Sequence, residues 1–533
     1  MYRLLKSGAF AILLTATATA LAQNQNIRFT EVASQAGLDY EHGYFAGSQI
    51  NEVQSMAGGV AVGDFDGDGW LDLYVVRGDL GPNLLFRNLG NGTFQEVGAV
   101  AGVGIWDGIG SGPAFLDFDG DRKLDLFIGG VERSSPKLFR NLGDGTFRDF
   151  TRESGIFIDG NTFSTAYGDF DRDGDLDLFM SHWIGVPSEH TAHLWRNDGQ
   201  GNFTPIDDIA GIEAYRELDF SFTPNFTDIN RDGWPDLLVT GDFGTSQIFV
   251  NNGDGSFSNT TSDVITDENG MGSAIGDFDN DGDFDWFVSS IYNPIGEPTG
   301  PNGMTGFTGN RLYRNLGDGT FEDATSSSGV RIGWWGWGAT FADLNNDGWL
   351  DLVHTNGFPI PDFEADPTVV FLANGDGTFR ETSLELGISD TGQGRGLVSL
   401  DFDRDGDQDI LITNNSGPPL LYRNDGGNQN GRFLNIRLWG KAPNTSAIGA
   451  RITVRTGGLS MIREVRCNNN YVSHQPAEVH FGVADALKAD IEVWWPNGET
   501  TFLTGVATNQ FLVINREKTV LRPFLEGRRN SRR

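Results

Sequence analysis

The chain has 533 residues, of which 38% are hydrophobic, and a formal net charge of −35. This length is enough for one large domain and a smaller one. The acidity argues against nucleic-acid binding, which requires a basic surface, and favours cations or basic partners. The sequence contains a single cysteine, Cys467, so it cannot form an intramolecular disulfide.

Residues 1–22 have the pattern of a secretory signal peptide. Arg3 and Lys6 precede the apolar run AFAILLTATATALA, which ends in a small-residue cleavage site. An uncleaved membrane anchor is the alternative, but the run is short for a membrane span. No later segment is long and apolar enough to serve as a transmembrane anchor. We therefore expect an exported protein that is secreted, periplasmic or held at a cell surface.

An acidic motif recurs seven times, and we number these segments loops 1 to 7. The copies are DFDGDGWLD from residue 64, DFDGDRKLD from 117, DFDRDGDLD from 169, DINRDGWPD from 228, DFDNDGDFD from 277, DLNNDGWLD from 343 and DFDRDGDQD from 401. A second motif with a glycine-rich turn, such as LFRNLGDGTF from 138, follows each copy. Two motifs that recur in this order indicate an internal repeat of about 50 residues.

Each repeat predicts four strands. A strand of small residues precedes the acidic loop, and an apolar run such as LDLYVV follows it. This run has the composition of a strand that is covered on both faces. A third strand contains a motif such as FRN, and the glycine-rich turn leads into a fourth strand. Four-stranded sheets at this period predict an all-β fold, a β-propeller, and seven copies predict seven blades within residues 23–428.

The N-terminal segment is predicted to close the propeller. Residues 28–37, RFTEVASQAG, are similar to the segments that form the fourth strand of each repeat, such as TFQEVGAVAG. The seventh repeat breaks off after LYRNDGG and lacks its own fourth strand. We therefore expect residues 28–34 to complete the last blade and to protect its sheet edge. An open solenoid is the alternative, but it would need terminal caps.

The acidic loops have the ligand spacing of a calcium site. EF-hand loops supply oxygen ligands from positions 1, 3, 5, 7 and 9, with glycine at position 6. In loop 1, Asp64, Asp66, Asp68 and Asp72 occupy positions 1, 3, 5 and 9, and Trp70 would offer its carbonyl oxygen from position 7. Position 12, a glutamate in EF-hands, falls inside the next strand. The loop is therefore shorter than an EF-hand and is closed by the position-9 carboxylate.

The same positions define the candidate ligands of the other loops. These are Asp117, Asp119, Asp121 and Asp125; Asp169, Asp171, Asp173, Asp175 and Asp177; Asp228, Asn230, Asp232, Trp234 and Asp236; Asp277, Asp279, Asp281, Asp283 and Asp285; Asp343, Asn345, Asp347, Trp349 and Asp351; and Asp401, Asp403, Asp405, Asp407 and Asp409. Up to seven Ca²⁺ ions are expected. Structural Asx turns are the alternative for a single loop, and Mg²⁺ prefers fewer protein ligands.

Three positions predict differences between the loops. Arg122 replaces glycine at position 6 of loop 2, so the site at 117–125 is the least secure of the seven. Asn230 and Asn345 keep an oxygen ligand at position 3 but lose its charge, so loops 4 and 6 are expected to bind calcium more weakly.

The repeats resemble the FG-GAP or VCBS repeats of integrin α-subunit propellers. The resemblance rests on the D-x-D-x-D-G-x-x-D loops and the trailing G-D-G-T-F turns, and it covers roughly residues 28–425. In that family such loops bind Ca²⁺, so the resemblance implies calcium binding here.

Residues 429–518 form a second predicted unit, a small β-domain. The segments IGARITVRTGG, REVRCNNNYVSHQ and IEVWWPNGE look like the ASPIC/UnbV domain, which follows such propellers in the cartilage acidic protein-like family. The resemblance implies an extracellular, adhesion- or matrix-like protein without an established reaction. Cys467 is expected to be a small, partly buried residue, with a reactive thiol as the alternative. Residues 519–533 are expected to form a basic, disordered tail.

The sequence leaves two hypotheses for function. No G-x-S-x-G, H-E-x-x-H or P-loop motif is present, so an enzyme is the less favoured class. The first hypothesis is a non-catalytic adhesion or matrix-type module that binds an extracellular protein or glycan, with calcium stabilising the blades. The second is a carbohydrate-active enzyme, similar to a polysaccharide lyase, or a lectin at the channel mouth, where Trp335 and Trp337 could stack on a sugar.

Overall fold

The computed structural model describes residues 27–523 apart from 46–49, 106–107, 133, 159, 186–191, 213–218, 294–306, 469 and 517–520. The predicted signal peptide and most of the predicted basic tail therefore lie outside the described residues. In the part of the chain that is described, no helix combines the length and the apolar character needed to cross a membrane.

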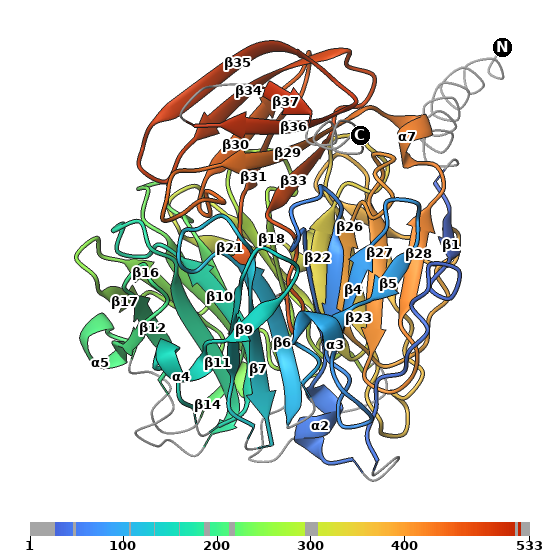
Figure 1. Cartoon of the computed structure of the whole chain (residues 1–533). Coiled ribbons are helices and arrows are strands. Elements are labelled where there is room, and N and C mark those ends of the chain that lie inside the picture. Colours follow the sequence, from blue (N-terminus) through green and yellow to red (C-terminus); the bar gives the residue numbers. More distant parts are fainter. Residues whose placement is uncertain are drawn as a thin grey trace, which may run out of the picture.

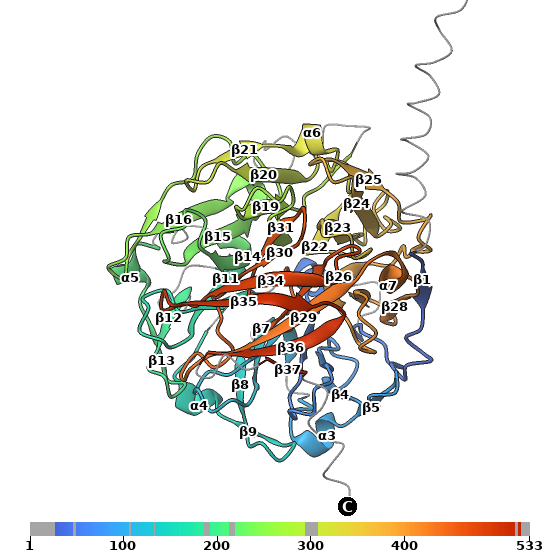
Figure 2. The same cartoon turned by 90° about the horizontal axis from the view of Figure 1, so that it is seen from above.

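The described repeats fold into four-stranded antiparallel units, called blades 1 to 7 here, which surround a common centre (Figure 2). Blades 1 to 3 contain β2 (Val60–Gly63), β3 (Asp72–Val75), β4 (Leu84–Asn88) and β5 (Phe94–Glu96); β6 (Ile109–Leu116), β7 (Asp125–Val131), β8 (Lys137–Asn141) and β9 (Phe147–Asp149); and β10 (Thr162–Gly168), β11 (Asp177–Gly185), β12 (Leu194–Asn197) and β13 (Phe203–Pro205). The predicted all-β class is confirmed.

The later blades repeat this order. Blades 4 to 6 contain β14 (Asp219–Thr227), β15 (Asp236–Gly241), β16 (Gln247–Asn251) and β17 (Phe257–Asn259); β18 (Ser273–Gly276), β19 (Asp285–Val288), β20 (Arg311–Asn315) and β21 (Phe321–Asp323); and β22 (Gly336–Ala342), β23 (Asp351–Asn356), β24 (Val369–Ala373) and β25 (Phe379–Glu381). A pairing between β11 and β14 joins blades 3 and 4 into one larger sheet.

The first strand of the chain belongs to the last blade. Blade 7 contains β26 (Gly394–Leu400), β27 (Asp409–Asn414) and β28 (Leu420–Asn424). The strand β1 (Phe29–Glu31) pairs with β28 in antiparallel register, with Phe29 opposite Asn424. The strand lies within the segment that sequence similarity assigned to this role.

Each blade is buried between its neighbours, which explains the apolar second strands. All four residues of β3 and all seven of β7 are buried. Between blades 1 and 2, Tyr74 and Leu85 pack in one cluster with Phe115 and Leu126. Burial on both faces removes the alternation of polar and apolar residues that a half-exposed strand would show.

The helices among the described residues are short and lie between strands. They are α2 (Glu52–Met56), α3 (Gly98–Ala101), α4 (Thr151–Ser154), α5 (Asp207–Ala210), α6 (Thr325–Ser328), α7 (Gly427–Asn430) and the 3₁₀ turn η3 (Asp242–Gly244). The helices α3, α4, α5 and α6 each follow the fourth strand of a blade and end at a glycine in the left-handed region, such as Gly102 at φ 81°. Glycine adopts this conformation without a steric penalty.

The C-terminal domain covers one face of the propeller (Figure 1). Its strands are β29 (Phe433–Trp439), β30 (Arg451–Arg455), β31 (Ser460–Glu464), β32 (Cys467–Asn468), β33 (Glu478–Gly482), β34 (Lys488–Trp494), β35 (Thr500–Ala507), β36 (Gln510–Asn515) and β37 (Leu521–Pro523). Two four-stranded sheets form, in the orders β33-β29-β36-β37 and β31-β30-β34-β35. Since β37 pairs with β36, regular structure extends past residue 518 into the segment predicted to be disordered.

A segment of the C-terminal domain, residues 467–475, enters the centre of the propeller. Its strand β32 pairs with β10 of blade 3, and His474 forms a bridge with Ala61 of blade 1. The carbonyl oxygen of Asn470 accepts hydrogen bonds from Ser273 N of blade 5 and Ala339 N of blade 6. This central segment therefore contacts the inner strands of blades 1, 3, 5 and 6.

Candidate metal centres

The position-9 carboxylate ties each acidic loop to its blade. Asp72 is the first residue of β3 and is fully buried. Its Oδ2 accepts a hydrogen bond from Phe65 N at 3.1 Å, and its Oδ1 accepts one from Asn88 N at 2.8 Å. The same pair of backbone bonds recurs at Asp125, Asp177, Asp236, Asp285, Asp351 and Asp409. The loop therefore returns to the start of the second strand in every blade.

Position 1 binds the backbone of its own loop. In loop 1, Asp64 Oδ2 accepts a hydrogen bond from Gly69 N at 3.0 Å. The other oxygen, Asp64 Oδ1, is buried and has no hydrogen-bond partner among the described residues. A buried carboxylate oxygen without a donor is costly. Asp64 Oδ1 is thus available for a cation.

Five loops bring three carboxylates together around one point. Positions 1, 3 and 9 of loops 1, 2, 3, 5 and 7 each offer an oxygen, and the three oxygens lie within 4.8 Å of one another. Calcium binds oxygen at 2.3–2.6 Å. Two oxygens on opposite sides of one ion would therefore be separated by about twice that length, which is close to the 4.8 Å within which these oxygens lie. The residues present therefore fit a calcium ion.

The position-5 carboxylates are not part of these groups. In loop 1, Asp68 Oδ1 accepts a hydrogen bond from Trp70 N at 3.1 Å, and Asp68 Oδ2 pairs with Arg87 at 3.0 Å. Position 7 also differs between loops: Asp283 of loop 5 pairs with Arg231 of loop 4, and Asp407 of loop 7 accepts a hydrogen bond from Asn346.

Loops 4 and 6 lack the third carboxylate. The side chains of Asn230 and Asn345 instead bond within their own loops: each Oδ1 accepts from the position-5 N–H at 3.0 Å, and each Nδ2 donates to the position-5 carboxylate at 3.0 Å. In loop 2, Arg122 adopts φ 71° at position 6, the left-handed conformation that glycine adopts at that position elsewhere.

Burial and neighbouring negative charges both raise the pKa of these carboxylates. Burial first, and then the neighbouring Asp119 and Asp117, raise the pKa of Asp125 to about 9, although hydrogen bonds from Asn141 and Phe118 oppose this shift. Burial likewise raises the pKa of Asp236 to about 8. Without a cation, keeping these carboxylates ionised therefore costs free energy. A bound divalent ion would offset this cost.

An arginine from the third strand contacts the position-3 carboxylate. Arg87 pairs with Asp66 at 2.7 Å, and Arg140 pairs with Asp119 at 2.9 Å. Arg196 pairs with Asp171 in the same way in blade 3. Sequence reasoning missed this role, although the recurrence of FRN or its variant WRN at the same place in the repeats carries the signal.

The asparagine of the same motif connects neighbouring blades. Asn141 Nδ2 donates to Leu124 O of its own blade at 2.9 Å and to Phe65 O of blade 1 at 2.8 Å. Equivalent bonds to the preceding blade are made by Asn88, Asn197, Asn251, Asn315 and Asn424. Blade 6 has Ala373 at this position. Sequence reasoning also missed this contact.

The two tryptophans considered as sugar-stacking residues lie at different depths. Trp337 is 1% exposed, with the Arg395 guanidinium 4.0 Å from its ring centroid and the Tyr471 ring at 5.1 Å. Protein groups therefore occupy the surroundings of Trp337, and a sugar would have to displace them. Trp335 is half-buried and stacks on Phe358 with ring centroids 4.4 Å apart.

Cys467 is buried within the central segment. Its Sγ lies 3.0 Å from His474 Nε2, and burial raises the pKa of the thiol far above its usual value. Burial also lowers the pKa of His474 to about 3. Both groups are therefore neutral at pH 7, which does not fit a reactive thiolate.

Fold and loops define a β-propeller with repeated acidic loops, and comparison with known proteins agrees. The FG-GAP-like repeat matches residues 64–128, 117–180, 183–239, 228–288 and 303–354, and the chain belongs to this family. The family of ASPIC and UnbV matches residues 440–520.

The chain is similar to the following proteins over the parts stated for each. Cartilage acidic protein 1 of Mus musculus is 23% identical over 489 residues, which cover 83% of this chain and 70% of the relative. Integrin alpha-V of Gallus gallus is 28% identical over 215 residues, 35% of this chain and 20% of the relative. A lectin from Agrocybe aegerita that recognises non-reducing terminal N-acetylglucosamine has a TM-score of 0.40 at 19% identity, covering 69% of this chain and 94% of that chain.

Proposed function

We propose that the protein is an exported, calcium-binding β-propeller protein and a non-catalytic module that binds an extracellular protein or glycan. The observation that carries the calcium assignment is the grouping of three carboxylates in five loops. The residues at positions 1, 3, 5, 7 and 9 of each loop are the proposed ligands. Export rests on the signal-like residues 1–22, and an adhesion or matrix role rests on the family resemblance.

Calcium, when bound, would neutralise the loop carboxylates and supply a shared centre of positive charge. The chain's own residues provide the rest of the arrangement. Asp72 anchors the ion-binding end of loop 1 to β3 through two backbone N–H groups, and Arg87 holds Asp66 from the third strand. Ion binding to the folded state alone would raise its stability.

The test is thermal unfolding of the purified protein in EDTA and in millimolar Ca²⁺, together with calorimetric titration. We expect a higher melting temperature in Ca²⁺ than in EDTA or Mg²⁺, and a stoichiometry of up to seven ions. Asp66→Asn should remove a carboxylate ligand from loop 1 and weaken or abolish binding of one ion. Equal melting temperatures in Ca²⁺ and EDTA would contradict the proposal.

The partner is tested by a glycan and matrix-protein array with and without Ca²⁺. Binding without turnover supports a binding module. Turnover of a glycan that is abolished by Trp335→Ala would instead support the alternative, a carbohydrate-active enzyme. Trp335 is the better probe than Trp337, because Trp337 is buried and its replacement would disturb the core.

A further inference from the structure

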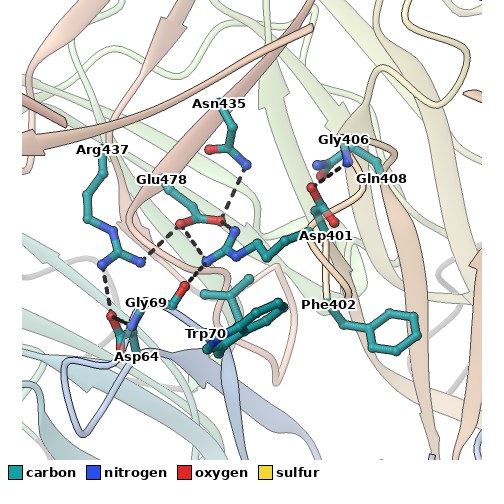
Figure 3. A network of polar contacts seen from close by, with 12 residues as sticks. Asp64, Gly69, Trp70, Asp401, Phe402, Gly406, Gln408, Asn435, Arg437 and Glu478 are labelled. Atoms are coloured by element: carbon teal, nitrogen blue, oxygen red, sulfur yellow. Dashed lines mark hydrogen bonds and ion pairs between the residues drawn. The ribbon is translucent and has the colours of Figure 1, made fainter. Parts of the chain in front are cut away.

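A chain of ion pairs connects the C-terminal domain to loops 1 and 7 (Figure 3). Arg437 of β29 pairs with Asp64 at 2.9 Å and with Glu478 of β33 at 3.1 Å. Glu478 also pairs with Arg404 of loop 7, and Arg404 Nη2 donates a hydrogen bond to Gly69 O of loop 1 at 3.1 Å. The network therefore joins the first blade, the last blade and the C-terminal domain at one place.

The two oxygens of Asp64 differ in their hydrogen bonding. Asp64 Oδ2 accepts hydrogen bonds from Gly69 N and from Arg437 Nη1. Asp64 Oδ1 has no partner among the described residues, and Asp64 belongs to the carboxylate group of loop 1. The C-terminal domain can thus orient this carboxylate without using the oxygen that faces no donor.

The network is well shielded from water. The side chains of Arg404 and Glu478 are 1% and 4% exposed, and that of Asp64 is 6% exposed. A buried ion pair that loses one partner leaves an uncompensated charge, so the members of such a network depend on one another. In this low-dielectric environment, the charge of a cation bound beside Asp64 would interact strongly with the neighbouring charged side chains.

We propose that Arg437 and Glu478 are positioning residues for the ion of loop 1, and that calcium binding there is coupled to docking of the C-terminal domain. This inference rests on the calcium binding proposed above. Arg437 orients Asp64 for the ion, and the ion in turn holds Asp64 where Arg437 reaches it. Coupling between two binding events is reciprocal, so each should weaken when the other is removed.

Loop 3 provides a matched internal control. Its position-1 residue, Asp169, accepts a hydrogen bond from Gly174 N, and no contact between Asp169 and a C-terminal arginine is found within the described residues. Its position-3 residue, Asp171, pairs with Arg196 at 2.9 Å, as Asp66 pairs with Arg87 at 2.7 Å in loop 1. The two loops thus share the arginine at position 3 and differ in whether a C-terminal arginine contacts the position-1 aspartate. They also differ at position 7, where loop 1 has Trp70 and loop 3 has Asp175.

The experiment is hydrogen exchange read by mass spectrometry on the full-length protein across a series of free Ca²⁺ concentrations. Peptides that cover residues 64–72 and 169–177 report calcium binding by loops 1 and 3 separately. We expect Arg437→Gln and Glu478→Gln to raise the Ca²⁺ concentration at half-protection of loop 1 by about fivefold or more, and to leave loop 3 unchanged. Arg437→Lys should partly restore loop 1 because it keeps the charge.

A control variant and a reverse measurement complete the design. Arg455→Gln removes an exposed ion pair with Glu492 within the C-terminal domain and should shift neither loop. In the reverse direction, Asp66→Asn should increase exchange in β29 and β33 in millimolar Ca²⁺, and Asp171→Asn should not. This arm decides the question if Arg437→Gln fails to fold.

The outcomes separate the two proposals. If Ca²⁺ protects no loop of the unmodified protein, the calcium function itself fails. If Ca²⁺ protects the loops but Arg437→Gln shifts loops 1 and 3 equally, or Asp66→Asn leaves β29 and β33 unchanged, the coupling is wrong and calcium binding stands.

Discussion

At the scale of single residues, an asparagine side chain bonds six of the seven blades to the preceding blade. Asn141 Nδ2 donates to Phe65 O across the boundary between blades 1 and 2, and to Leu124 O within blade 2. Phe65 is buried and Leu124 is partly buried, so water has little access to either carbonyl group. The side chain therefore satisfies two backbone acceptors that the strand pairing leaves open.

Removal of this side chain should destabilise the propeller. We expect Asn141→Ala to lower the free energy of unfolding by about 1–3 kcal/mol, because it leaves buried acceptors without a donor. Chemical denaturation in Ca²⁺ measures the effect. An unchanged midpoint would mean that the inter-blade bond contributes nothing.

Blade 6 offers the opposite substitution. Ala373 occupies the position of the asparagine, and the acceptors equivalent to those of Asn141 are Phe278 O and Leu350 O. Ala373→Asn should therefore raise stability by about 0.5–1.5 kcal/mol. Ala373→Asp is the matched control, since aspartate has the same shape but no donor when ionised, and it should destabilise.

At the scale of structural elements, the carboxylates of loop 1 at positions 3 and 9 have different contacts. The position-9 residue, Asp72, accepts two backbone hydrogen bonds and begins β3. The position-3 residue, Asp66, accepts a hydrogen bond from Asp68 N and pairs with Arg87 nearer the surface. Asp72 thus fixes the loop to the sheet, and the main proposed role of Asp66 is to bind the ion.

This division predicts different costs in the absence of metal. In EDTA, Asp72→Asn should lower the free energy of unfolding by about 1–3 kcal/mol, because the amide turns an N–H group toward a backbone donor. Both changes remove repulsion among the carboxylates. Asp66→Asn should cost less in EDTA, because Asp66 accepts one backbone hydrogen bond, from Asp68 N, which an amide oxygen can still accept. Denaturation curves of both variants test this, and equal losses would argue against separate tasks.

The repeated elements could be predicted from the sequence, and their long-range contacts could not. Spacing alone placed Asp64, Asp66 and Asp72 at one candidate site. The left-handed backbone at position 4 could not be predicted from composition, because Arg172, Arg231 and Arg404 stand there in loops 3, 4 and 7. The pairing of Arg437 with Asp64 joins residues 373 positions apart, and one sequence gives no measure of which distant charges meet.

At the scale of the whole molecule, buried histidines are distributed through the blades and the C-terminal domain. Burial lowers the pKa of His42, His182 and His354 to about 4. In an unfolded chain histidine titrates near pH 6.5. The folded protein thus binds fewer protons than the unfolded chain between these values.

The consequence is a loss of stability in mild acid. Because the folded pKa values lie below the unfolded value, stability is full above about pH 6.5 and falls as the pH is lowered toward about 4. We expect the melting temperature in millimolar Ca²⁺ to fall between about pH 7 and about pH 5. His354→Gln should show a shallower fall.

The same measurement in EDTA should give a smaller fall. Burial raises the pKa of loop carboxylates such as Asp125 and Asp236, so in the absence of metal their protonation favours the folded state as the pH decreases. A melting temperature in Ca²⁺ that is constant across this range would contradict the role of the histidines.

The central segment sets an order of events during synthesis of the chain. Val60 N and Val60 O, in the first blade, bond to Ser473 Oγ and His474 N, and the ribosome makes those partners more than four-fifths of the way along the chain. The Val60 backbone groups therefore lack these partners until Ser473 and His474 have been synthesised. Contacts between such distant residues form slowly and leave apolar surface exposed meanwhile. We therefore expect the nascent propeller to need chaperone protection until the C-terminal domain emerges.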